Sequence, residues 1–374
     1  MLPSARFLAL VACVSTLAVA AGCVGPMLAP ASGTAPGFQV DAAWPQPLPN
    51  RWILGQVSGV SVGPDDHVWI LQRPRSLSED EAGAAQNPPH GDCCMPAPPV
   101  LEFASDGRLL RSWGGPGAGY AWPGNEHGIH VDPKGFVWIT GNGDNDGQIL
   151  KFTPDGRLVL QIGKTGAQTS NADTTRLGRA ASVEVDAAAN ELYVADGYHN
   201  RRVIVFDADT GAYKRHWGAY GRPPVDARPE SRRSVGPTEA QLQQFGTPVH
   251  CVRIARDGLV YVCDRLNNRV QVFHKDGSFV REFMVEPETT ANGSVWDIVL
   301  SRDPAQQWLL LADGRNNQIW TIDRATGTVA GSIGRPGRYA GEFHWVHDLA
   351  IDSRGNLYAG EVDTGKRVQK FVRR

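Results

Sequence analysis

From about residue 50 to its end, the chain alternates short apolar segments with polar turns. Within a segment, apolar and polar positions alternate residue by residue, which is typical of β-strands that bury one face. Turn residues such as Asp-Gly and Pro-Lys-Gly separate the segments. No segment carries an apolar stripe at helical spacing. The pattern therefore predicts an all-β protein.

One arrangement of strands is repeated six times along the chain. Each repeat begins with a hairpin of two apolar strands, and most repeats continue with a second pair joined by a turn. The six hairpins begin at Val57, His127, Ala181, His250, Val295 and His347. Four strands in each of six repeats predict a six-bladed β-propeller.

The last repeat has only three strands before the chain ends at Arg374. Residues 38–44 precede the first repeat and can supply the missing strand. We therefore predict a propeller over residues 38–374, with its ring closed by an N-terminal strand.

Three histidines, His127, His250 and His347, each stand eight residues before the glycine of a hairpin turn. They fall in repeats two, four and six, and alternate blades of a six-bladed ring are about 120° apart. Three imidazoles can therefore converge on the axis, where three neutral histidines with an open fourth position are typical of catalytic zinc. The alternative is a set of hydrogen-bonded histidines in a wet central channel. The matching positions in the other repeats are poor ligands: Ser58, Ala181 and Trp296.

Two more polar residues, Arg73 and Tyr198, follow second strands and should lie on the rim that carries the histidines. The longest insertions, residues 74–99, 115–126, 219–249 and 335–346, fall on the same rim, and loops of this length usually form lids or binding walls. An arginine can clamp a carboxylate, and a tyrosine beside a cation and a metal is a candidate base. Taken singly, either residue is expected to make a surface ion pair or to pack.

The net charge of −2 and the lack of basic runs argue against nucleic acid as a partner. At the N-terminus, one cation and an apolar run predict a signal peptide over residues 1–22. Residues 20–23 resemble a lipobox with Cys23 as the lipidated residue, and residues 23–37 read as a flexible tether. We expect a periplasmic or outer-membrane lipoprotein, or alternatively secretion without a lipid. Membrane contact is expected only through this anchor.

Four cysteines are left once Cys13 and Cys23 are set aside, which suits an oxidising compartment. Cys251 and Cys263 are placed symmetrically about a hairpin turn, so they should face each other as a disulfide or as two buried thiols. Cys93 and Cys94 can form a vicinal disulfide, pair elsewhere, or take a redox or metal role.

Several motifs together resemble the NHL-repeat propellers, and specifically the peptidyl-α-hydroxyglycine α-amidating lyases, over about residues 50–372. The matching motifs are GQVSGV from Gly55, VWILQR ending at Arg73, HGI from His127, DGYHNRR from Asp196, FGTPVH, CDRLNNRVQVF and the pair His347-Asp348.

The resemblance implies zinc on the three histidines, Tyr198 as the base and Arg73 as its electrostatic partner, which also faces the substrate carboxylate. It further implies a structural calcium ion held by Asp348 and the backbone carbonyls of Val60 and Ile129. The alternative for Asp348 is a turn or cap residue.

The implied reaction splits a carbinolamide, R-CO-NH-CH(OH)-COO⁻, into an amide and glyoxylate, and a related small carboxylate or peptide-like compound is also compatible. We expect a monomeric, metal-dependent carbon–nitrogen lyase. Two alternatives stay open. One is a non-catalytic exported propeller that binds protein, peptide or envelope polymer through its loop-rich face. The other is a calcium-dependent lactonase or hydrolase on the same architecture.

Overall fold

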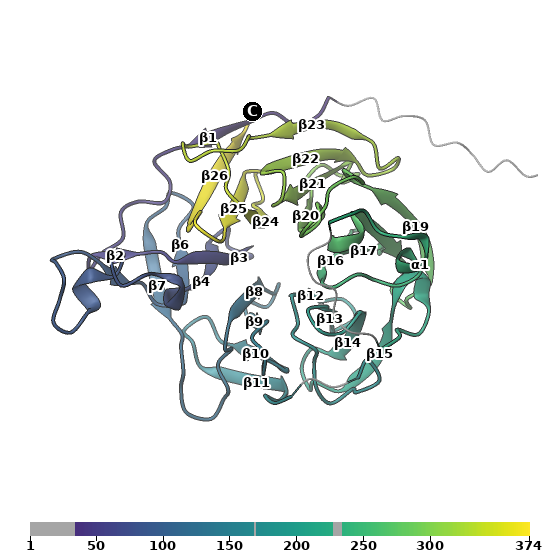
Figure 1. The fold of residues 1–374 in the computed structure, drawn as a ribbon, viewed down its shortest axis with the longest axis horizontal. Helices are drawn as coiled ribbons and strands as arrows, with labels where there is room; N and C mark the ends of the chain where they lie inside the picture. Colours follow the sequence, from purple (N-terminus) through teal and green to yellow (C-terminus); the bar gives the residue numbers. More distant parts are fainter. Residues whose placement is uncertain (1–33, 168–169, 227–233) are drawn as a thin grey trace, which may run out of the picture.

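Six four-stranded antiparallel sheets surround a central axis in the computed structural model (Figure 1). The structure describes residues 34–167, 170–226 and 234–374. The predicted signal peptide, Cys23 and most of the tether lie outside these residues. No helix in the described part is long and apolar enough to cross a membrane. The prediction of an all-β, six-bladed propeller is confirmed.

Each blade runs outward from an inner strand beside the axis. The first three blades consist of β3 (Gln56–Val62), β4 (Val68–Arg73), β6 (Val100–Phe103) and β7 (Leu109–Trp113); β8 (Glu126–Val131), β9 (Val137–Gly141), β10 (Gln148–Phe152) and β11 (Leu158–Gly163); and β12 (Ser182–Asp186), β13 (Glu191–Asp196), β14 (Arg202–Asp207) and β15 (Tyr213–Trp217). The next two consist of β16 (Val249–Ile254), β17 (Val260–Asp264), β18 (Arg269–Phe273) and β19 (Phe279–Met284); and β20 (Asp297–Leu300), β21 (Trp308–Asp313), β22 (Gln318–Asp323) and β23 (Val329–Ile333).

The sixth blade joins the two ends of the chain. It consists of β24 (Val346–Ile351), β25 (Leu357–Glu361), β26 (Arg367–Arg373) and the N-terminal strand β1 (Phe38–Asp41). β1 pairs antiparallel with β26, with Phe38 opposite Arg373. This closure agrees with the predicted N-terminal strand.

The remaining elements are short and lie in the connections between strands. They are β2 (Trp52–Ile53), β5 (Met95–Pro96), the 3-10 turns η1 (Pro74–Ser76), η2 (Gly83–Ala85), η3 (Ala219–Gly221) and η4 (Arg265–Asn267), and the helix α1 (Glu239–Leu242). The loop after β4 contains the short strand β5, which pairs with β2. The loop therefore packs on the outer side of blade one, and Figure 1 shows it extending away from the axis. This loop does not cover the axis as a lid would.

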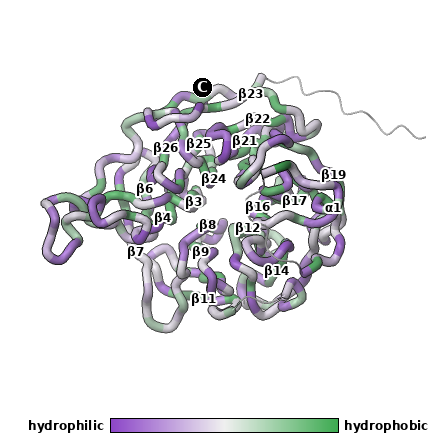
Figure 2. The backbone as a smooth tube through the Cα atoms, in the orientation of Figure 1, coloured by the Kyte–Doolittle hydropathy of each residue, from purple (hydrophilic) through white to green (hydrophobic). Residues whose placement is uncertain are grey.

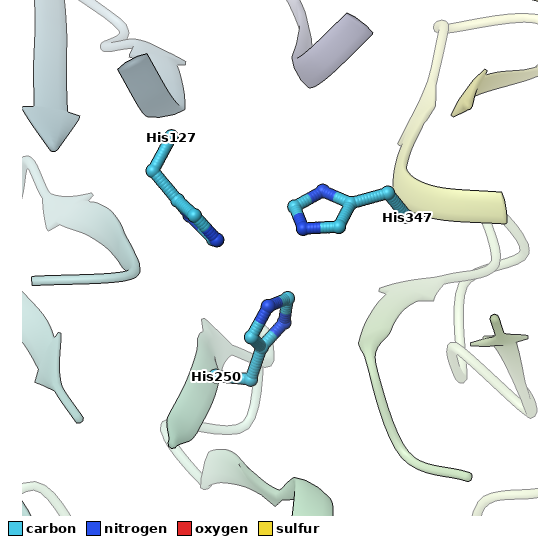
Figure 3. Close-up of side chains that lie close together, drawn as sticks. All are labelled: His127, His250 and His347. Atoms are coloured by element: carbon cyan, nitrogen blue, oxygen red, sulfur yellow. The ribbon is translucent and has the colours of Figure 1, made fainter. Parts of the chain in front are cut away.

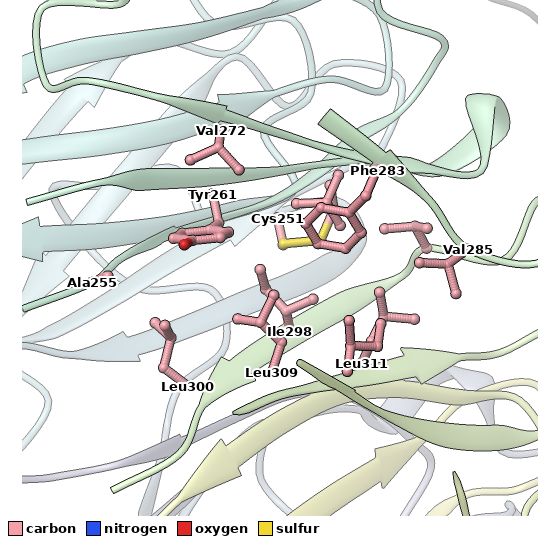
Figure 4. Close-up of a cluster of buried hydrophobic side chains, with 14 residues drawn as sticks. Cys251, Ala255, Tyr261, Val272, Phe283, Val285, Ile298, Leu300, Leu309 and Leu311 are labelled. Carbon is pink, nitrogen blue, oxygen red and sulfur yellow. A yellow bond between two sulfur atoms is a disulfide. The ribbon is translucent and has the colours of Figure 1, made fainter. Parts of the chain in front are cut away.

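The hydrophobic core lies between neighbouring blades. One cluster, shown in Figure 4, combines Cys251 and Tyr261 of blade four with Ile298 and Leu309 of blade five. Along the whole ring, apolar residues are interspersed with polar ones, as Figure 2 shows. Burying one face of each sheet against the next therefore holds the blades together.

A disulfide joins Cys251 to Cys263 across β16 and β17, where the two residues are paired in register. Replacing both cysteines with alanine is expected to lower the free energy of unfolding by about 2–3 kcal/mol, because a cross-link restricts the unfolded chain. Denaturant unfolding of the variant and the wild type measures this loss. A reducing agent should destabilise the wild type more than the variant, which keeps only the bridge between the adjacent residues Cys93 and Cys94; equal stability of all samples would contradict the expectation. Cys93 and Cys94 form a second, vicinal disulfide in the loop beside blade one.

Candidate metal centre

Local irregularities in the inner strands turn three histidines toward the axis. In β16, Val249 pairs with Asp264 and Cys251 pairs with Cys263, so His250 is an extra residue on its strand. The register of β24 skips His347 in the same way, and that of β8 shifts at His127. Such β-bulges re-aim side chains. The bulges therefore direct three imidazoles to one point.

The three histidines lie together and are 2–3% exposed. Their ring centroids are 4.8–5.0 Å apart, and one candidate ligand atom from each lies within 4.8 Å of the others. Figure 3 shows the rings approaching a common space from three different strands. The structure thus brings together His127, His250 and His347, as the spacing predicts.

Backbone carbonyls of the intervening blades fix the orientation of each ring. His127 Nδ1 lies 2.8 Å from the carbonyl oxygen of Ala181, His250 Nδ1 lies 2.5 Å from that of Trp296, and His347 Nδ1 lies 2.8 Å from that of Ser58. A carbonyl only accepts, so each Nδ1 carries the hydrogen and each Nε2 keeps a lone pair. The positions that offer no side-chain ligand therefore orient, through their backbone carbonyls, the histidine of the preceding blade in the ring.

Burial is the main reason why the pKa of each of these histidines lies well below its usual value. The charge of Arg265 lowers all three further, and that of Arg73 lowers the pKa of His127 and His347. The imidazoles are therefore neutral at pH 7, the form that binds metal. Three neutral imidazole nitrogens around an open position are the donor set of a catalytic zinc ion. The residues present thus fit zinc.

Tyr198 follows β13 and places its phenol oxygen at the centre. This oxygen lies 2.9 Å from Nε2 of His127 and 3.1 Å from Nε2 of His250. A phenol in this place can exchange a proton with a molecule bound at the open position. The structure therefore brings the predicted base to the three histidines.

Arg73 ends β4 on the same side of the ring, but it does not bond to Tyr198. Its guanidinium donates to the backbone carbonyl of Glu126 at 2.6 Å and to the side-chain oxygen of Gln56 at 2.7 Å. Burial lowers the pKa of Arg73, while the nearby Tyr198 and Glu126 act to raise it. Both bonded acceptors are uncharged, and the carboxylate of Glu126 acts on Arg73 only through its charge, so the guanidinium is available to act on the centre.

Arg265 is a second cation at the centre, and the sequence reasoning missed it. Its guanidinium donates to the phenol oxygen of Tyr198 at 3.2 Å and lies 4.6 Å from the ring centroid of Trp296. Arg265 directly follows β17, the second strand of its blade, just as Arg73 ends β4. A search for polar residues at the ends of second strands would therefore have found it. Of the two cations, Arg265 is the one that contacts the candidate base.

The residues predicted to bind calcium lie just beneath the histidines. Asp348 is a strand residue of β24, and its Oδ2 accepts the backbone N–H of Val60 at 2.9 Å. Its Oδ1 lies 3.4 Å from the guanidinium of Arg253, and the predicted carbonyl donor Ile129 lines the same space. Calcium takes six or more oxygen ligands. These residues do not fit a calcium ion as they lie, because a cation already contacts the carboxylate.

A cavity of 280 Å³ opens on the axis beyond these charges, toward the opposite rim. Every blade contributes apolar residues to its walls, among them Val62, Val131, Val185, Ile254, Leu300 and Ile351. Glu184 and His130 are among its polar residues. Burial raises the pKa of Glu184 to about 7, although the charge of Arg253 acts to lower it. For His130, burial and the charge of Arg253 act in the same direction and lower the pKa to about 3.

The raised pKa of Glu184 predicts a pH-dependent cost to stability. The folded protein holds the proton of the Glu184 carboxyl more tightly than the unfolded chain does. The stabilisation that this proton provides is therefore fully present below pH 4.5 and is lost as the pH rises through about 7. Glu184→Gln should therefore be more stable than the wild type by about 1–3 kcal/mol at pH 8 and similar to it at pH 4.5. Unfolding titrations across this range measure the difference. The exposed control Glu288→Gln should show no such trend, and a Glu184→Gln advantage that is equal at both pH values would contradict the prediction.

The fold and this site define a class of protein: a six-bladed propeller with a buried three-histidine centre on its axis. No protein-family model matches the chain. NHL repeat-containing protein 3 of Mus musculus is 31% identical over 249 residues, which are 64% of this chain and 58% of that protein.

Enzymes of peptide amidation are also relatives. The probable peptidyl-alpha-hydroxyglycine alpha-amidating lyase of Caenorhabditis elegans is 23% identical over 321 residues, 84% of this chain and 81% of the worm protein. Peptidyl-glycine alpha-amidating monooxygenase B of Xenopus laevis is 29% identical over 243 residues, 63% of this chain and 25% of that enzyme. The homologues of this chain thus include amidating lyases and NHL-repeat proteins, and they indicate a lyase-like propeller.

Solved structures agree on the fold. A streptogramin B lyase aligns with a TM-score of 0.51 at 13% identity and covers 91% of this chain and 98% of its own. A protein of unknown function from Bacteroides thetaiotaomicron aligns with a TM-score of 0.54 at 14% identity, over 91% of this chain and 73% of its own. At this identity the likeness shows the propeller architecture alone.

Proposed function

We propose that the protein is a zinc-dependent carbon–nitrogen lyase that cleaves an α-hydroxyglycine-type carbinolamide into an amide and glyoxylate, or acts on a related small carboxylate. One observation carries the proposal: the phenol oxygen of Tyr198 lies within hydrogen-bond distance of Nε2 of His127, Nε2 of His250 and the guanidinium of Arg265. A base, a cation and two metal-ligand atoms thus meet at one point. The relatives named as amidating lyases support the same reaction class.

His127, His250 and His347 would hold the zinc ion, which supplies stabilisation of the negative charge that develops on the substrate hydroxyl oxygen. Tyr198, as phenolate, accepts the hydroxyl proton. Electrons from the O–H bond form the carbonyl of glyoxylate while the C–N bond breaks, and the phenol of Tyr198 returns the proton to the leaving amide nitrogen. Atoms and charge balance without a further reactant.

The two arginines take different roles in this proposal. Arg265 donates to the phenol oxygen, so it orients that oxygen and places a positive charge beside it. Arg73 is held by uncharged acceptors, and its positive charge is suited to the substrate carboxylate. Together they make the centre positive, which favours an anionic substrate over a neutral one.

We further propose that the protein is exported, because its cysteines are paired as in proteins of oxidising compartments. A non-catalytic propeller that binds a partner through its loops is less well supported. Such a propeller has no use for three buried, neutral histidines that converge on the axis with a tyrosine hydroxyl against two of them, since polar groups are costly to bury.

Product analysis tests the proposed reaction. Zinc-loaded protein is incubated with an N-acyl-α-hydroxyglycine peptide, and the amide and glyoxylate are measured by mass spectrometry against zinc-free protein. The proposal expects both products in equal amounts and at a rate far above that of the zinc-free control. Products formed no faster than in the control, or cleavage at the acyl carbon instead, would count against it.

A further inference from the structure

Three ionisable side chains close the axis directly beneath the histidines. Arg253 comes from β16, Asp297 from β20 and Asp348 from β24, so the group joins blades four, five and six. One terminal nitrogen of Arg253 lies 2.8 and 2.9 Å from the two carboxylate oxygens of Asp297 and 3.4 Å from Asp348 Oδ1. The side chains are 13%, 3% and 12% exposed. A buried cation is thus shared by two buried carboxylates.

Backbone groups complete this cluster. The Nε of Arg253 donates to the carbonyl of Ile298 at 3.0 Å. Asp348 Oδ2 accepts the N–H of Val60, and Asp297 Oδ2 accepts the N–H of Leu349 at 2.9 Å. Buried charges are tolerated only when they are paired and hydrogen-bonded in this way. The cluster links β3, β16, β20 and β24 across the axis and is internally satisfied.

This is also the place where the resemblance to amidating lyases leads one to expect calcium. A calcium ion bound by Asp348 and the carbonyl of Val60 would lie against the guanidinium of Arg253, and like charges at such short range in a buried site repel strongly. Burial acts to lower the pKa of Arg253, but the carboxylates of Asp297, Glu184 and Asp348 outweigh it and hold the pKa above its usual value. The guanidinium therefore stays charged and keeps its place.

We propose that the guanidinium of Arg253, paired with Asp297 and Asp348, takes the structural place of a calcium ion on the propeller axis, so that this protein binds no calcium there. The inference depends on the fold and on these contacts, and it holds whether or not the lyase reaction occurs. The protein then needs a metal at the three histidines only.

Calcium binding to the wild type is the first test. Purified protein is stripped of metals, reloaded with zinc alone and titrated with calcium, while melting temperature and heat of binding are recorded. We expect no binding heat and no change in melting temperature. A stoichiometric calcium ion that raises the melting temperature of the zinc-loaded wild type would overturn the proposal. This experiment uses only the wild type, so it tests the proposal even if a variant does not fold.

Arg253→Ala gives the second test, because it leaves two buried carboxylates without their cation. Val60 donates its N–H to Asp348, and the carbonyl of an extended residue lies on the same strand edge as its N–H, so oxygen ligands for a divalent ion are at hand. We expect a lower melting temperature without calcium and a rise of about 3–5 °C when calcium is present at a hundred times its Kd. A folded Arg253→Ala protein whose melting temperature does not change with calcium would overturn the proposal.

Arg302→Ala is the matched control. Arg302 lines the same cavity, but among the described residues it donates to backbone carbonyls and pairs with no carboxylate. Its variant should show no calcium response, and a response equal to that of Arg253→Ala would overturn the assignment to Arg253. All readouts are calcium binding and thermal stability, so failure of this inference is distinguishable from failure of the lyase reaction, which is measured by glyoxylate release.

Discussion

Replacing Tyr198 with phenylalanine is expected to lower kcat for carbinolamide cleavage by about a thousandfold, the usual contribution of a positioned general base. The change removes only the phenol oxygen, which lies 2.9 and 3.1 Å from two histidine nitrogens. Steady-state kinetics of glyoxylate release at saturating substrate measures the loss. The variant should still hold one zinc ion per chain, because the three histidine ligands are untouched.

Tyr213→Phe is the matched control for this variant. Tyr213 is 41% exposed on the outer strand of blade three, and its hydroxyl contacts His216 rather than the centre. Its replacement should leave both kcat and zinc content unchanged. Full activity of Tyr198→Phe would remove the tyrosine from the mechanism, and zinc loss in that variant would give it a structural role instead.

Replacing His250 with alanine is expected to weaken zinc binding by more than about a hundredfold, since even residues that only support metal ligands contribute ten- to a hundredfold. Only two of the three converging imidazoles are then left, and the disulfide and core of blade four hold the strand in place. Chelator competition and metal content per chain measure the affinity, and glyoxylate release should fall to the background rate.

His130→Ala controls for the loss of any buried histidine. His130 lies in the same channel, but its ring accepts the backbone N–H of Val185 at 3.3 Å and does not reach the centre. This variant should bind zinc like the wild type. If His250→Ala keeps the wild-type affinity for zinc, the three histidines are not the metal site.

The propeller and the convergence of the histidines could be predicted because both follow from periodicity. Alternating strands at regular intervals define the blades, and equal offsets in alternate repeats define a common direction. The ring closure was accessible for the same reason, since a blade with three strands requires a fourth. Arg73 and Tyr198 followed from strand direction alone.

The finer structure of the centre depends on features that leave no periodic signal. A β-bulge adds a single residue and looks like continued alternation in sequence, although it decides that His250 faces the axis. The carbonyls that orient the rings belong to the backbone. The side-chain types of Ser58, Ala181 and Trp296 therefore give no indication that these residues bond to the histidines.

Ion pairs between residues far apart in the chain could not be predicted from the sequence either. Arg253 occupies a polar position of an ordinary strand, and its carboxylate partners are 44 and 95 residues away in the chain. Only the closed ring brings these three residues to the axis. The resemblance to amidating lyases implied calcium at Asp348, whereas the structure places a guanidinium against that carboxylate.

The rate of glyoxylate release as a function of zinc added to metal-free protein tests the central claim most directly. If the three histidines form one catalytic centre, the rate should rise in proportion to bound zinc and level off at one zinc ion per chain. A rate that stays at background when the three histidines are saturated with zinc, or full turnover in metal-free protein, would contradict it.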